Sequence, residues 1–140
     1  MVESEARAPV PSSIVEALSG KTMLLTGVTG FLAQVVFERL LANFPETRVT
    51  LLVRSQTGAT SRERVEYLFR KPAFDTLRER VGKDGLMSML DERVDVIDGD
   101  FGRGQPEVPA GIDIAMHSAA TVSFDPPIDE GFMTNLQGAM

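Results

Sequence analysis

The sequence contains no cysteine, which excludes disulfides, thiolate metal sites and a covalent acyl-cysteine intermediate within these 140 residues. Histidine is nearly absent as well, because His117 is the single example in the chain. A lone imidazole has no second histidine or cysteine with which to share a metal ion, so we expect no metal site. His117 lies at the end of a predicted strand, where we expect it to pack or to form a backbone hydrogen bond rather than to act as a base.

Positive charge is scarce too. The chain has 14 lysine and arginine residues against 20 aspartate and glutamate residues, which gives a net charge of -6. Nucleic acids and anionic membranes both favour a basic surface, so neither is expected as the main partner. An anionic small molecule held at a local cationic site remains compatible with this balance.

Long apolar runs are missing. No segment approaches the roughly 20 apolar residues that cross a bilayer, so we expect no integral membrane segment. Residues 1–7 are acidic and have no apolar stretch, which is unlike a secretory signal. We therefore expect a cytoplasmic protein.

What is present is a globular composition, 43% hydrophobic and 24% charged, in which short apolar runs alternate with helical patterns. Residues 1–20 read as a mobile tail with a short helix, because residues 13–16 have the spacing of a capping box. Helices are expected over residues 31–42, over 60–91 with an interruption at Pro72, and from Ile128 onward. Buried strands are predicted at residues 21–26, 48–54, 93–97 and 112–117.

The helix expected over residues 31–42 has a defined apolar face. Leu32, Val36 and Leu40 recur at helical spacing, whereas Glu38 and Arg39 fall on the opposite side. We therefore predict that Leu32, Val36 and Leu40 pack against the sheet.

A glycine-rich turn joins the first strand to this helix. The strand stops at Gly27, and the helix starts just after Gly30, which exposes backbone N–H groups and the positive end of the helix dipole. Gly27 permits the tight turn, Gly30 lets the backbone come close to phosphates, and Ala33 takes the place of a third glycine. A turn without a ligand is the alternative, but the flanking strand and helix favour a dinucleotide site. With crossovers between successive strands, residues 21–140 are predicted to form an α/β Rossmann-type doubly wound parallel sheet, incomplete, with about four strands.

The end of the second strand indicates which dinucleotide is bound. NAD sites usually carry an acidic residue there, but residues 47–62 contain none, and Arg54 occupies the position. An arginine suits the 2′-phosphate of NADPH, with Ser55 and Arg64 as possible assistants; a solvated strand-end arginine is the alternative. Asp100, after the third strand, could accept a hydrogen bond from adenine or simply form an Asx turn.

Five segments then occur in order and carry a family resemblance: residues 26–32, 52–54, 99–100, 117–125 and 134–138. Together they resemble the extended short-chain dehydrogenase/reductases and, within them, the fatty acyl-CoA reductase group. Residues 69–75 also look like the insert of that group. The resemblance implies that NADPH reduces a long-chain fatty acyl-CoA to an aldehyde, and in some members to the alcohol.

The resemblance also implies roles for individual residues. The pyrophosphate would be held at the glycine turn, the 2′-phosphate by Arg54, and the adenine near Asp100. Asn135 matches the helix asparagine that supports the active-site lysine through water. The implied cofactor-binding residues are Gly27, Thr29, Gly30, Phe31, Leu32, Arg54, Ser55, Arg64, Asp100, Phe101, Ala119, Ala120 and Thr121.

One departure from the family pattern is severe, because the catalytic Tyr-x-x-x-Lys pair is missing. Tyr67 and Lys71 have the spacing, but they lie in the insert between the second and third strands, so we interpret the match as coincidence and expect the phenol to pack on its helix. We expect no catalytic residue within the chain, a truncation before the pair, and no turnover by this piece alone. The alternatives are a thioester reductase module of a carboxylic acid reductase or peptide synthetase, another extended short-chain reductase, and a non-catalytic NADP-binding sensor.

Overall fold

Four short apolar segments form a parallel sheet in the order β3-β2-β1-β4. The computed structural model describes residues 11–100, 103, 106–120 and 127–136. β1 and β2 pair from Thr22 opposite Arg48 to Thr26 opposite Leu52. The predicted α/β fold with a parallel sheet is confirmed. The strands are β1 (Thr22–Thr26), β2 (Arg48–Val53), β3 (Val94–Asp98) and β4 (Ile114–Met116).

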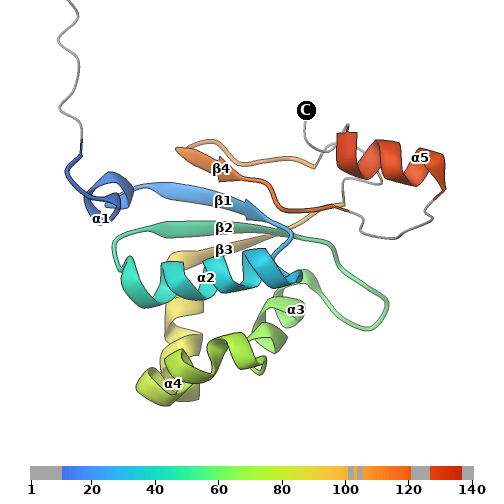
Figure 1. Cartoon of the computed structure of the whole chain (residues 1–140). Coiled ribbons are helices and arrows are strands. Elements are labelled where there is room, and N and C mark those ends of the chain that lie inside the picture. The colour runs from blue at the N-terminus through green and yellow to red at the C-terminus, as the bar shows by residue number, and fades with distance from the viewer. Residues whose placement is uncertain (1–10, 101–102, 104–105, 121–126, 137–140) are drawn as a thin grey trace, which may run out of the picture.

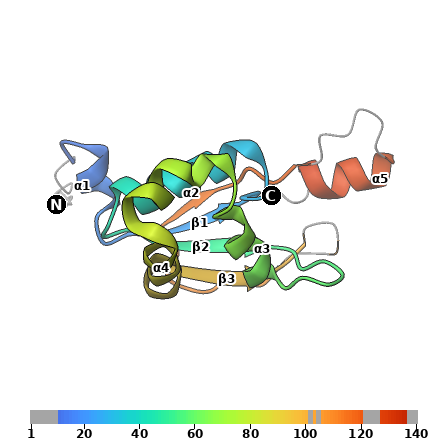
Figure 2. The same cartoon turned by 90° about the horizontal axis from the view of Figure 1, so that it is seen from below.

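The helices that join these strands gather on one side of the sheet. Figure 1 shows α2, α3 and α4 below the strands, and Figure 2 shows α2 and α4 crossing in front of them when the molecule is seen from below. α5 lies apart from this layer, beyond the ends of the strands. The helices are α1 (Ile14–Leu18), α2 (Phe31–Asn43), α3 (Ser61–Leu68), the 3₁₀ turn η1 (Pro72–Phe74), α4 (Asp75–Arg93), α5 (Ile128–Gly131) and the π-helical η3 (Phe132–Leu136).

Local sequence signals account for the ends of several helices. The hydroxyl of Ser13 accepts from the Glu16 N–H at the start of α1, and Thr60 and Glu63 form a full capping box at the start of α3. The expected interruption at Pro72 is present as η1, and α4 is kinked at Gly82, where φ is +73°. Residues 1–10 of the expected tail and residues 137–140 of the last expected helix lie outside the described residues.

The main core lies between the sheet and the helix layer. Alternate residues of the strands, such as Leu25 and Leu51, are fully buried against the helices. Three phenylalanines meet in this layer, with Phe74 edge-on to Phe37 at 5.8 Å and to Phe69 at 5.2 Å between ring centroids. The insert between β2 and β3 is therefore part of the core rather than a loose excursion.

The predicted apolar face of α2 is right at Val36 and Leu40, which pack on the core, and wrong at two other positions. Leu32 is 62% exposed, whereas Glu38, placed outside by the sequence pattern, is 3% exposed with its carboxylate 3.0 Å from Arg39 Nε. The stripe that faces the core also contains Ala33 and Phe37. An alanine gives little apolar signal in a sequence, although its small side chain allows the helix to approach the sheet closely.

The strand order changes direction at β1. From β1 the chain moves to β2 and β3 on one side, and then returns across the sheet to β4 on the other side of β1. Open parallel sheets bind ligands outside the carboxyl ends of the strands at such a switch in direction. In this molecule the switch lies between β1 and β4, where Gly27 follows β1 and Ser118 follows β4. No helix in the described ranges is long and apolar enough to cross a membrane.

Candidate functional site

The turn after β1 needs a glycine for two separate reasons. Gly27 has a φ of +73°, a backbone conformation that side chains disfavour. A Cβ atom on Gly27 would also lie 2.5 Å from the carbonyl carbon of Ser118 and 2.7 Å from the nitrogen of Ala119. The turn is closed by the Gly30 N–H, which donates to the Gly27 carbonyl at 2.8 Å. The chain after β4 therefore passes directly over the glycine turn.

Thr26 holds these two chain segments together. Its buried hydroxyl oxygen accepts from the backbone N–H groups of Ser118 at 3.1 Å and Ala119 at 3.2 Å. The same oxygen lies 2.9 Å from Nδ1 of His117. The single histidine of the chain is thus in contact with the end of β1, next to the glycine turn.

The start of α2 is open to a ligand. Gly30 is its N-cap and supplies no side-chain hydrogen bond, and Phe31 and Leu32 are 82% and 62% exposed. The first N–H groups of a helix have no partner inside the helix, and they carry the positive end of its dipole. Among the described residues, a Cβ on Gly30 would meet only the Gly27 carbonyl oxygen within 4 Å, at 3.2 Å. This geometry fits the pyrophosphate of a dinucleotide.

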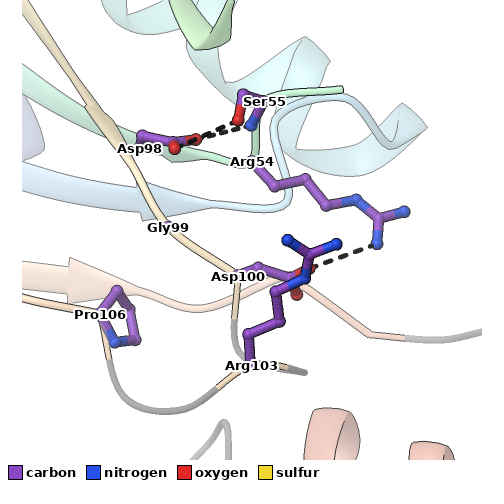
Figure 3. A pocket seen from close by; sticks show the side chains of 7 residues that line it. All are labelled: Arg54, Ser55, Asp98, Gly99, Asp100, Arg103 and Pro106. Carbon is purple, nitrogen blue, oxygen red and sulfur yellow. Dashed lines mark hydrogen bonds and ion pairs between the residues drawn. The ribbon is translucent and has the colours of Figure 1, made fainter. Parts of the chain in front are cut away.

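A pocket of about 230 Å³ lined by two arginines and two aspartates lies at the ends of β2 and β3 (Figure 3). Arg54 follows β2 and is 61% exposed, with Nη1 3.9 Å from a carboxylate oxygen of Asp100. Arg103 reaches the same oxygen from the opposite side, with Nε at 3.8 Å. Two arginines therefore converge on one carboxylate. The pocket is lined by Arg54, Ser55, Asp98, Gly99, Asp100, Arg103 and Pro106.

Arg64 stands behind this pocket rather than in its lining. From the first turns of α3, its Nη1 donates a hydrogen bond to the backbone carbonyl of Arg54. Burial and the nearby charge of Arg54 both lower the pKa of Arg64. Arg64 thus fixes the backbone of Arg54 and adds positive potential behind it.

The family model described as "Male sterility protein" matches residues 25–140, which include the glycine turn, Arg54 and Asp100. The chain belongs to the male sterility protein family. It is 37% identical over 138 residues to a probable fatty acyl-CoA reductase 5 from Arabidopsis thaliana, an alignment that covers 90% of this chain and 28% of that protein. It is 34% identical over 128 residues to fatty acyl-CoA reductase 1 from Homo sapiens, covering 89% of this chain and 25% of the human protein.

Solved structures show the same fold. The terminal R domain of the myxalamid PKS-NRPS pathway has a TM-score of 0.60 and 26% identity, over 86% of this chain and 30% of that one. A reductase domain of a nonribosomal peptide synthetase from Mycobacterium tuberculosis has a TM-score of 0.54 and 25% identity, over 84% and 28% of the two chains. The chain spans about a quarter of the length of the curated relatives that it matches. Together these matches support a Rossmann-like fold and a nicotinamide cofactor.

In this male sterility family member, the structure groups some predicted residues and separates others. Gly27, Gly30, Arg54 and Asp100 lie along the carboxyl edge of the sheet, and Ala119 touches the glycine turn through its backbone. Asn135 lies in the exposed η3 and is not part of the pocket lining. Thr29 and Ala120 are exposed. Phe101 and Thr121 lie outside the described residues.

In the part of the chain that the structure describes, Tyr67 does not line the pocket of Arg54. It is 53% exposed on α3, and its ring lies 4.8 Å from Lys71 Nζ and 5.8 Å from Arg70 Cζ. It lines a different hollow, together with Leu86 and Met87 of α4. The ring thus contacts the two cationic residues just after the end of α3, and the expectation that the phenol packs on its own helix stays a prediction.

Sequence reasoning missed three residues around the pocket: Asp98, Ser61 and Arg103. Asp98 accepts hydrogen bonds from both Ser55 and Ser61, which lower the pKa of its carboxyl group. An acidic residue at the carboxyl end of a predicted strand was a signal for Asp98. Arg103 carried no such signal, because nothing in the loop after Asp100 indicates which way it folds.

Proposed function

We propose that this chain binds NADPH and that it serves the reduction of a fatty acyl-CoA thioester. The observation that carries the proposal is the pair of arginines, Arg54 and Arg103, beside an uncapped helix start at the end of β1. A dinucleotide with an extra phosphate on its adenosine ribose needs a site for its pyrophosphate and a cationic site for the 2′-phosphate. The names of the relatives supply the substrate class.

The glycine turn would hold the pyrophosphate. The backbone N–H groups of Phe31 and Leu32 lie in the first turn of α2, where the helix dipole favours an anion. Gly27 and Gly30 keep side chains out of the approach, and the exposed hydroxyl of Thr29 is available as a further donor. The side chains of Phe31 and Leu32 extend outward and would shield the bound phosphates from water.

The pocket lined by Arg54 and Arg103 would hold the 2′-phosphate and the adenine. Arg54 can turn its guanidinium from Asp100 to a phosphate, because an ion pair at 3.9 Å on an exposed side chain holds it weakly. Ser55 offers a hydroxyl beside it, and Arg64 keeps the Arg54 backbone in place. Asp100 would accept a hydrogen bond from the adenine amino group. NADH lacks the phosphate and would leave the arginines unused.

The chain after β4 would guide the nicotinamide ribose toward the substrate. Ala119 and Ala120 are small and lie where the chain leaves Thr26, and Thr121 follows them in sequence. Bound NADPH would supply a hydride to the carbonyl carbon of the thioester. Asn135 would act as a supporting group for a lysine, as in the family.

Two other functions are alternatives. The solved reductase domains belong to peptide and polyketide synthetases, which favours a carrier-bound thioester as an alternative to acyl-CoA. A non-catalytic NADP sensor would use the same glycine turn and Arg54 to bind the nucleotide without reducing a substrate.

The decisive experiment compares the binding of NADPH and NADH by nicotinamide fluorescence, which is unobscured because the protein has no tryptophan. We expect the wild type to prefer NADPH, and Arg54→Ala to weaken NADPH binding by about tenfold to a hundredfold, since a charged hydrogen-bonding pair is lost. NADH binding should change little.

Arg48→Ala is the matched control, because Arg48 is also an exposed arginine of β2 but lies at its opposite end. It should leave the ratio of the two affinities as in the wild type. A ratio unchanged by Arg54→Ala would overturn the assignment of Arg54.

A further inference from the structure

Asp98 is the last residue of β3, and it ties that strand to the segment after β2. Its Oδ1 accepts from the backbone N–H of Ser55 at 2.6 Å and from the hydroxyl of Ser61 at 2.6 Å. Its Oδ2 accepts from the Ser55 hydroxyl at 3.2 Å. Figure 3 shows the bonds to Ser55 next to Arg54. We call Ser55, Ser61 and Asp98 the clasp.

The clasp closes both ends of the β2–α3 loop. Ser55 lies at the beginning of this loop, and Ser61 is the first residue of α3. Between them the chain turns back on itself, with Gln56 and Ala59 exchanging backbone hydrogen bonds at 3.0 Å. One carboxylate therefore fixes where the loop leaves the sheet and where it re-enters the helix layer.

The clasp positions Arg54 indirectly, through Ser55 and Arg64. The clasp holds the N–H of the next residue, Ser55, while Arg64 of α3 holds the Arg54 carbonyl. Because Ser61 anchors the start of α3, it also determines where Arg64 stands. The guanidinium of Arg54 is left 61% exposed, facing the pocket.

We propose that Asp98 is a positioning residue that sets the preference for a 2′-phosphorylated nucleotide, by holding Ser55 and Ser61 so that Arg54 meets the phosphate. This inference rests on the proposed NADPH site and deepens it. Asp98 would act through Ser55 and Ser61, whose three hydrogen bonds engage both of its oxygens.

Charge alone predicts the opposite effect, which makes the proposal testable by sign. Asp98 lines the same pocket as Arg54, so its negative charge repels a phosphate placed there. If Asp98 contributed only that charge, removing it would tighten NADPH binding. If it positions Arg54, removing it weakens NADPH binding despite the relief of repulsion.

The test measures dissociation constants for NADPH and NADH in Asp98→Ala. We expect NADPH binding to weaken roughly fivefold to tenfold, with NADH changing less than about twofold, because only the 2′-phosphate contact depends on Arg54. Asp95→Ala is the matched control. Asp95 is an exposed aspartate of the same strand whose ion pair with Arg48, at 3.5 Å, lies at the far end of the sheet.

A second pair of variants keeps the test decisive if Asp98→Ala fails to fold. Ser61→Ala removes one of the three hydrogen bonds and should weaken NADPH binding by about twofold to fivefold. Ser61→Thr keeps the hydroxyl and should restore the wild-type ratio of NADPH to NADH affinity. A purely structural role for Ser61 would lower both affinities together.

The outcomes separate this inference from the function on which it rests. A wild type that binds neither nucleotide overturns both. A wild type that prefers NADPH while Asp98→Ala keeps the same ratio, or binds NADPH more tightly, overturns the clasp and leaves the NADPH site standing. Equal losses for both nucleotides also overturn it, because they show that the clasp merely stabilises the fold.

Discussion

The two ends of β1 use the same residue in the same conformation for different reasons. Gly20 precedes the strand with φ at +69°, and Gly27 follows it with φ at +73°. A Cβ on Gly20 would meet nothing within 4 Å, whereas a Cβ on Gly27 would meet the backbone of Ser118 at 2.5 Å. At the amino end the glycine serves a turn. At the carboxyl end it also lets the segment after β4 come into contact with the turn.

The charges on the two edges differ in the same way. At the amino edge, Lys21 pairs with Asp113 and Arg48 pairs with Asp95, each at 3.5 Å. At the carboxyl edge, Arg54 and Arg103 share the carboxylate of Asp100 at the longer distances of 3.9 and 3.8 Å, and the second aspartate of the pocket, Asp98, is held by Ser55 and Ser61. The amino edge therefore has one carboxylate for each cation, whereas the two arginines of the carboxyl edge share one weak contact that an anion can replace.

The comparison of the two glycines predicts the largest effect. Gly27→Ala should lower the free energy of unfolding by about 3–5 kcal/mol, because the unfavourable φ adds to a clash with backbone atoms that cannot move aside cheaply. Gly20→Ala has only the conformational term and should cost about 1–2 kcal/mol. Urea unfolding of the two variants measures both. Equal losses would show that the contact with Ser118 is not what demands glycine at position 27.

The sequence was informative wherever a function depends on the local backbone. The glycine turn and the arginine at the end of β2 follow from strand and helix patterns, and the structure brings Arg54 and Asp100 to one pocket as their strand-end positions indicate. Parallel strands place their carboxyl ends at one edge, so strand assignment alone is sufficient to predict this grouping.

Features that depend on packing between distant segments could not be predicted in this way. The face of α2 was misassigned in part, because Ala33 and Phe37 join the core and Leu32 does not. The clasp joins Ser55 and Ser61 to Asp98 across 43 and 37 residues. No local pattern specifies that two serines and one carboxylate of separate elements will meet.

The amino edge has its own anchor in Arg93, which predicts a moderate effect on stability alone. This half-buried residue ends α4, and its guanidinium donates to the carbonyl oxygens of Leu40, Leu41, Phe44 and Thr47. Burial lowers the pKa of Arg93, yet the charge remains at neutral pH and complements the carboxyl end of α2.

Arg93→Ala should reduce the free energy of unfolding by about 2–3 kcal/mol, because several buried carbonyls lose a charged donor. Arg93→Lys should recover part of the loss, since an ammonium group keeps the charge but cannot span all four carbonyls. The ratio of NADPH to NADH affinity should stay at its wild-type value in both variants. A changed ratio would mean that the two edges are coupled, contrary to the comparison above.

The smallest expected effect concerns acid sensitivity at the amino edge. Asp113 accepts from the Thr22 N–H at 2.9 Å, and this hydrogen bond, aided by Lys21, lowers the pKa of its carboxyl group below the ordinary value of 3.8. A carboxyl whose pKa is lowered by folding stabilises the protein above about 3.8 and loses that contribution as the pH falls through its folded value. Asp113→Asn should therefore flatten the decline of stability below about pH 4, measured as the midpoint of thermal unfolding across a pH series, without altering the preference for NADPH.

Asp98, whose pKa is also lowered by its hydrogen bonds, provides the contrast, because replacing it should change both the acid response and the cofactor preference. If Asp113→Asn shifted the cofactor preference as well, the two edges could not be treated as separate in function.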